Sequence, residues 1–98
     1  MVAVAQDHIA SLTADYDQDA DVLYVPIGEP RPGMGEDGPD DVVLRYSQDD
    51  HQPSGVTVLG FRENGWALRT QALAAIIAHH AGVSAAEAQD IVVNATSV

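Results

Sequence analysis

Alternating apolar and polar residues predict four β-strands in the first two-thirds of the chain. Leu12, Ala14 and Tyr16 alternate with polar residues, which is the period of two of a half-buried strand. Residues 21–27 (DVLYVPI) are rich in β-branched and aromatic side chains, a composition typical of strands. The predicted strands cover residues 12–16, 21–27, 42–47 and 56–62.

Polar segments separate these strands and contain the residues that turns prefer. Residues 17–20 are rich in aspartate, whose carboxylate can accept hydrogen bonds from its own backbone. Residues 28–41 contain four glycines, three prolines and five acidic residues. We therefore predict a surface loop over 28–41 and a second polar loop over 48–55.

The strand over 21–27 is apolar on both of its faces. Leu23, Val25 and Ile27 point to one side, and Val22 and Tyr24 point to the other. A sheet that is covered on one face only shows a cleaner alternation. We therefore expect a helix or another subunit to cover the second face.

The periodicity changes to that of a helix after residue 65. Apolar residues from Leu68 onward follow one stripe of a helix, and Gly82 is well placed to end it. Ser84 and Glu87 have the Ser-x-x-Glu spacing of a capping box, which predicts a second helix from Ala85.

These patterns together predict an α+β fold in a single domain, residues 1–98. The expected architecture is a four-stranded antiparallel β-meander over 12–63, followed by a C-terminal helical hairpin over 66–94 that packs on the sheet. A chain of 98 residues has the length of one domain.

The charge of the chain narrows the range of partners. Four arginines and no lysine stand against fifteen acidic residues, which gives a net charge of −11. A field of this sign repels nucleic acid and anionic lipid, so we expect no direct nucleic-acid or membrane binding. It favours a basic protein as partner; the alternative is that the acidity only keeps the protein soluble. The chain has no cysteine, and its first residues lack the pattern of a signal peptide, so we expect a cytoplasmic protein.

The segment Tyr16-Asp17-Gln18-Asp19-Ala20-Asp21-Val22-Leu23-Tyr24 resembles the Tyr-Asp…Asp-x-Leu-Tyr signature of a family of small bacterial domains of unknown function, number 2283 in the usual numbering of such families. The resemblance covers roughly residues 12–63, and it implies a small β-meander domain. Some members look like partners of small toxin-like proteins encoded in paired genes, which implies antitoxin-like binding of a basic protein. No catalytic residues carry over from this family.

Four aspartates at alternate positions are the candidates for a metal site. An EF-hand loop that starts at the first of them would need glycine and glutamate where the chain has Ala20 and Pro26. A hairpin turn also splays successive side chains. We predict turn formation rather than a metal site for these residues, which are Asp15, Asp17, Asp19 and Asp21.

Asp49, Asp50 and His51 place two carboxylates and an imidazole in one loop. This cluster supports an alternative function as a small-molecule or metal-dependent enzyme, although catalysis also needs a pocket and a third positioned group. The adjacent His79 and His80 point about 100° apart on a helix and so cannot chelate one ion together. We expect His79 to be solvated and His80 to lie at the edge of the core.

The leading prediction is a non-enzymatic protein-interaction domain with no cofactor, forming a homodimer or binding a basic partner. The motivation is the doubly apolar strand at 21–27, the apolar helical segment and the lack of catalytic motifs. The predicted interaction surface consists of Val22, Tyr24, Leu68, Ile76 and Ile77.

Overall fold

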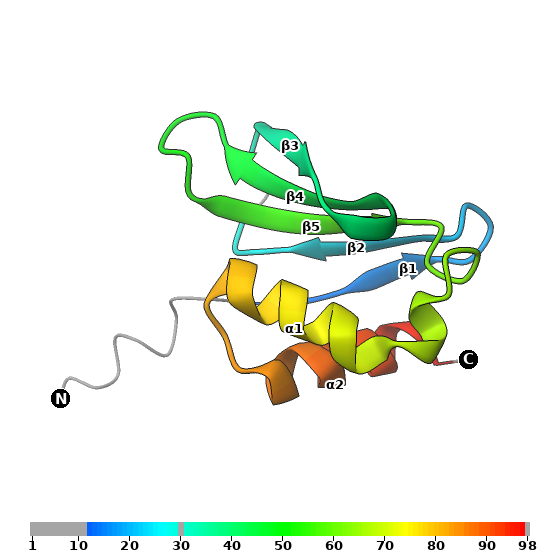
Figure 1. Ribbon diagram of the computed structural model, residues 1–98. Coiled ribbons are helices and arrows are strands. Elements are labelled where there is room, and N and C mark those ends of the chain that lie inside the picture. The colour runs from blue at the N-terminus through cyan, green and yellow to red at the C-terminus, as the bar shows by residue number, and fades with distance from the viewer. Residues whose placement is uncertain (1–11, 30, 98) are drawn as a thin grey trace, which may run out of the picture.

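Five antiparallel strands form one sheet in the computed structural model, which describes residues 12–29 and 31–97. Two helices pack on one face of this sheet (Figure 1), so the α+β class is confirmed. Residues 1–11, 30 and 98, which the expected single domain over 1–98 includes, lie outside the described residues. The strands are β1 (Asp15–Asp17), β2 (Val22–Pro26), β3 (Gly33–Asp37), β4 (Val42–Ser47) and β5 (Pro53–Leu59).

The strand order is β1-β2-β5-β4-β3, which corrects the expected four-stranded meander. The last strand, β5, lies between β2 and β4, so the chain crosses the end of the sheet after β2 and reaches its far edge at β3. Only β3, β4 and β5 follow one another as in a meander. The pairing of β2 with β5 runs from Val22 opposite Leu59 to Pro26 opposite Gly55.

The additional strand β3 lies inside the segment that was expected to be a loop. Its sequence GMGED contains two glycines, which strands normally disfavour. The ladder with β4 holds it, and Gly35 allows the two strands to approach closely. A Cβ at Gly35 would lie 2.6 Å from Cγ1 of Val43, so only glycine fits without a shift of this neighbour.

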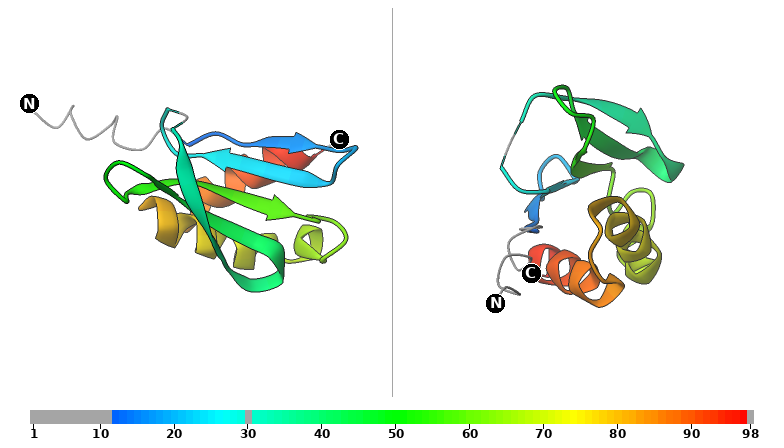
Figure 2. Two further views of the ribbon diagram at one scale, coloured as in Figure 1. Left: turned by 90° about the horizontal axis from the view of Figure 1, so that it is seen from above. Right: turned by 90° about the vertical axis from the view of Figure 1, so that its left-hand side faces the viewer.

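The helical third contains α1 (Thr70–Ala81) and α2 (Ala85–Thr96), preceded by the 3₁₀ turn η3 (Trp66–Leu68). Gly82 ends α1 in the left-handed conformation, with φ of 76°, as its position predicts. The end view in Figure 2 shows both helices on the same side of the sheet. They contact each other along their length and contact β5 and β1.

Ser84 caps α2, and the effect of replacing it is the first testable prediction. Its hydroxyl oxygen accepts a hydrogen bond from the Glu87 amide at 3.1 Å. Ser84→Ala should destabilise the fold by about 1 kcal/mol and lower Tm by about 4–8 °C, measured by thermal melting. Ser84→Thr keeps the acceptor oxygen and should retain most of the stability. Equal losses in both variants would contradict the capping role.

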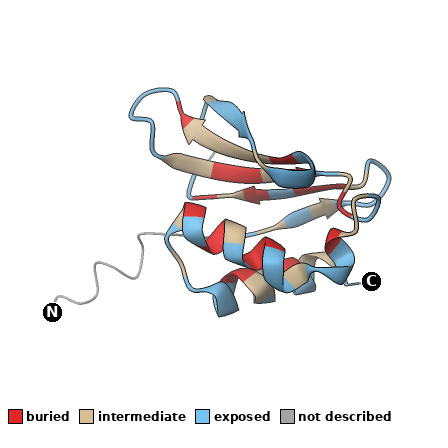
Figure 3. Ribbon diagram, in the orientation of Figure 1, coloured by how far each residue is buried: buried red, intermediate tan, exposed pale blue. Residues whose placement is uncertain are grey.

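The hydrophobic core lies between the sheet and the helices. Alternate residues of the central strands point toward α1 and α2, and Figure 3 shows buried residues in the central strands and in both helices. The largest fully buried side chains are Trp66 and Phe61. The core residues from the strands are Leu23, Val25, Val42, Val56 and Val58, and those from the helices include Leu73, Ile77, Ala88 and Val92.

Candidate interaction surface

The sheet face opposite the helices, which we call the open face, has no helix or strand of the described residues packed on it. Tyr24 and Leu59 point to this side, and each remains 44% exposed. The helices cover the side of the 21–27 strand that carries Leu23 and Val25. No helix of the described residues covers its second face, so of the two expected covers only another subunit stays a prediction. Val22 also points to the open face but is buried.

One row of side chains crosses all five strands on the open face. The paired residues from β1 to β3 are Asp15, Tyr24, Thr57, Val43 and Asp37. Directly paired residues of antiparallel strands point to the same face. The row therefore has an aromatic and aliphatic centre with one carboxylate at each edge of the sheet.

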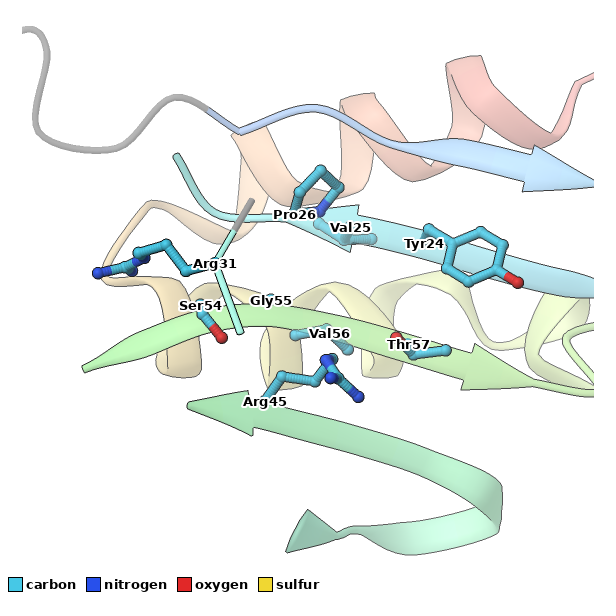
Figure 4. A pocket seen from close by; sticks show the side chains of 9 residues that line it. All are labelled: Tyr24, Val25, Pro26, Arg31, Arg45, Ser54, Gly55, Val56 and Thr57. Carbon is cyan, nitrogen blue, oxygen red and sulfur yellow. The ribbon is translucent and has the colours of Figure 1, made fainter. Parts of the chain in front are cut away.

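The neighbouring row places Arg45 beside a small cavity on the same face. Its members are Pro26, Gly55, Arg45 and Gly35. Because Gly55 and Gly35 have no side chains, they leave space beside the Arg45 side chain. Figure 4 shows the Arg45 side chain rising from β4 beside the edge of β5. The cavity has a volume of about 210 Å³ and is lined by Tyr24, Val25, Pro26, Arg31, Arg45, Ser54, Gly55, Val56 and Thr57.

The aspartates of the 15–21 segment do not form a cation loop. Asp17 Oδ1 accepts hydrogen bonds from the amides of Asp19 and Ala20, at 3.1 and 3.2 Å, which builds the predicted turn. Asp15 and Asp19 are exposed. Within residues 12–29 and 31–97, no three histidine or acidic side chains gather in a way that could hold a metal ion.

Asp21 has a different role, because its carboxylate joins the first hairpin to the turn after β5. Asp21 Oδ1 accepts from the Tyr16 hydroxyl at 2.6 Å and from the Arg62 amide at 2.8 Å, and Oδ2 accepts from the Glu63 amide at 3.0 Å. Arg62 Nε donates to the Tyr16 hydroxyl oxygen at 3.0 Å. Tyr16 also contacts Phe61 edge to face. This cluster locks two segments that are distant in sequence.

The same contacts shift two pKa values in opposite directions. Partial burial tends to raise the pKa of Asp21, but the hydrogen bonds from Tyr16, Arg62 and Glu63, together with the Arg62 charge, lower it below its ordinary value. Burial, and then the hydrogen bond donated to Asp21, raise the pKa of the Tyr16 hydroxyl. The folded state therefore favours ionised Asp21 beside neutral Tyr16.

Asp49, Asp50 and His51 lie in the exposed turn between β4 and β5. Asp50 Oδ1 accepts from the Gln52 amide at 3.0 Å, and Asp50 Oδ2 lies 3.6 Å from a guanidinium nitrogen of Arg31. The Gln52 hydrogen bond and then the Arg31 charge hold the pKa of Asp50 below its ordinary value. None of these three residues lines the cavity beside Arg45.

A second hollow lies between α1 and β4, where the sheet extends past the helices. It has a volume of about 610 Å³ and includes Leu44, Tyr46 and Ile76 in its lining. His80 is buried beside it, as expected for the edge of the core, with Nε2 2.9 Å from the Arg45 carbonyl oxygen. His79 is exposed, as predicted.

The five residues of the predicted interaction surface do not form one patch. Ile77 is fully buried in the core and Ile76 lies at the second hollow. Leu68 is 91% exposed in η3, before α1. Only Tyr24 combines exposure with a place on the open face. Leu59, Thr57 and Arg45 were missed, although the alternation of Leu59 and Thr57 with Val58 and Val56 along β5 was visible in the sequence.

Comparison of the chain with protein-family models, with curated proteins and with solved structures finds no match. The resemblance to the family of small bacterial domains therefore stays a prediction. Across the described part of the chain, neither helix has the length and apolar character needed to cross a bilayer.

Proposed function

We propose that this protein is a non-enzymatic interaction domain that binds a basic protein on its open face. The observation that carries the proposal is the row through Tyr24 and Thr57, which ends in a carboxylate at each edge. An aromatic residue that is 44% exposed on an uncovered face is typical of the centre of a protein interface.

Charge selects the kind of partner. The net charge of −11 accelerates the approach of cationic molecules and opposes the approach of anionic ones. Asp15 and Asp37 place negative charge on both sides of the apolar centre. A cationic surface with apolar residues at its middle is complementary to this arrangement. Binding should weaken as salt concentration rises, because these carboxylates are exposed and are screened by ions.

Two matched substitutions test whether the open face is the binding surface. Leu59 on the open face is 44% exposed, and Val93 on α2 is 40% exposed. Leu59→Asn and Val93→Asn each remove one exposed aliphatic side chain without changing net charge. We expect immobilised Leu59→Asn protein to lose cationic binders that the wild-type protein captures from a cell extract at low salt, and Val93→Asn to retain them.

The identity and affinity of each captured protein decide the outcome. The proposal is supported if a captured protein has a high isoelectric point and if calorimetry shows that Leu59→Asn binds it at least about tenfold more weakly than Val93→Asn does. Acidic captured proteins, or equal losses in both variants, would contradict it. The expectation of a homodimer is tested by sedimentation of the protein alone. If the protein is a dimer that Leu59→Asn dissociates and Val93→Asn does not, the open face binds a second copy of the chain. That result would overturn the proposal that the open face binds a basic protein.

A further inference from the structure

Arg45 differs from the other three arginines of the chain in having no polar partner among the described residues. Arg31 lies near Asp50 at 3.6 Å, Arg62 donates to the Tyr16 hydroxyl, and Arg69 lies 3.1 Å from an Asp40 oxygen. Within residues 12–29 and 31–97, no carboxylate or carbonyl accepts a hydrogen bond from the Arg45 guanidinium. This is unusual in a chain with fifteen acidic residues.

The strand register explains why Arg45 stays without a carboxylate. Directly opposite it lie Gly55 on β5 and Gly35 on β3. The nearest acidic residues of the open face, Asp15 and Asp37, belong to the neighbouring row. A Cβ at Gly35 would be 3.7 Å from Nη1 of Arg45, so the guanidinium lies close to a bare backbone. The N–H groups of the Arg45 guanidinium are therefore free to bind a group from solution.

The surroundings of Arg45 add the other parts of a binding site. Tyr24 and Pro26 supply an aromatic and an aliphatic wall, and the hydroxyl-bearing Ser54 and Thr57 also line the cavity. Figure 4 shows the Arg31 side chain extending away from Arg45, and its guanidinium lies 3.6 Å from Asp50, so Arg45 supplies the unpaired cation of the cavity. The volume of about 210 Å³ is below the roughly 300–1,000 Å³ of pockets that enclose a drug-sized ligand. It suits a single residue.

We infer that this cavity binds one carboxylate carried on a short apolar stem, supplied by the bound partner. The planar guanidinium donates two parallel hydrogen bonds to such a group. The partner's C-terminal residue and an acidic side chain share this chemistry. The inference rests on the proposed function for the source of the carboxylate, and the cavity itself is testable in the isolated protein. A carboxylate here would fix the register of an otherwise cationic partner.

The test is an NMR titration of the full chain with small probes. N-acetyl-leucine mimics a chain terminus, and N-acetyl-glutamate α-amide mimics an acidic side chain. We expect one or both of these probes to give saturable chemical-shift changes at the Gly55 and Thr57 amides. The probe with the larger response identifies whether the carboxylate comes from a chain terminus or from an acidic side chain. N-acetyl-leucine amide, which has no carboxylate, should give none. An equal response to inorganic phosphate would overturn the assignment to a carboxylate on an apolar stem.

Three variants locate the response. Arg45→Gln should weaken binding of N-acetyl-leucine at least tenfold. The affinity of Arg45→Lys should lie between those of the wild type and of Arg45→Gln, because lysine keeps the charge but lacks the planar guanidinium. Arg69→Gln, at a residue that does not line the cavity, changes net charge equally and should alter binding less than threefold. Binding that survives in Arg45→Gln, or is lost equally in Arg69→Gln, overturns the inference. If neither carboxylate probe shifts the amides of the wild-type protein, carboxylate binding by the cavity is refuted, whatever the partner does. If a basic partner binds away from the open face, the proposed function alone is refuted.

Discussion

Replacing Trp66 with alanine should lower the free energy of unfolding by about 3–5 kcal/mol. The indole is among the largest fully buried side chains, and its truncation leaves a cavity that the helices cannot fill. Its Nε1 also donates to the Asp40 carbonyl oxygen at 3.1 Å, and the Arg69 guanidinium lies 3.9 Å from the indole ring. The substitution therefore removes core volume and one link between η3 and the β3–β4 connection.

Urea denaturation followed by circular dichroism measures this loss. Trp66→Phe is the informative companion, because it keeps most of the apolar volume and removes the Nε1 donor. It should cost about 1–3 kcal/mol, since the Asp40 carbonyl then lacks its indole partner. It also remains measurable if the alanine variant does not fold. A Trp66→Phe loss as large as that of Trp66→Ala would show that the hydrogen bond, rather than packing, dominates.

Replacing Asp21 with alanine should lower the free energy of unfolding by about 2–3 kcal/mol. The change removes the acceptor of three hydrogen bonds, from Tyr16, Arg62 and Glu63. It also places alanine at φ of 59°, a conformation that aspartate tolerates better. Asp19→Ala in the same turn is the matched control, and this exposed residue should cost less than about 0.5 kcal/mol. Similar losses at the two positions would contradict the role given to Asp21.

The contribution of Asp21 should also depend on pH. Its folded-state pKa is lower than the ordinary value of 3.8, so the folded state binds the proton less well than the unfolded state does. This stabilisation is present above pH 3.8 and is lost as the pH falls through the folded pKa. The stability difference between wild type and Asp21→Asn should therefore shrink on acidification. A constant difference from neutral pH down to the acid transition would refute this linkage.

Local patterns predicted the fold wherever neighbouring residues decide the structure. The cap at Ser84, the stop at Gly82 and the alternation of Leu23 and Val25 depend on residues within a few positions of each other. The strand β3 was missed because GMGED has little strand preference of its own, and its ladder with β4 comes from tertiary pairing.

The candidate site was harder to predict for the same reason. The row from Asp15 to Asp37 and the place of Arg45 between two glycines depend on which strand lies beside which. The sequence shows that Thr57 and Leu59 share a face, but it does not show that β5 is central. The meander that was expected would have paired different residues and separated Tyr24 from Thr57.

The central position of β5 has a consequence for the nascent chain. Until residues 53–59 are made, the hairpin that contains β2 and the hairpin that contains β4 have no strand between them. Each then exposes an unpaired backbone edge that includes valines of the future core, and such edges are sites of aggregation. Closing the sheet joins Pro26 to Gly55, a pairing of distant segments that is entropically slow to form. A ribosomal pause before β5 would therefore prolong the exposure of both edges.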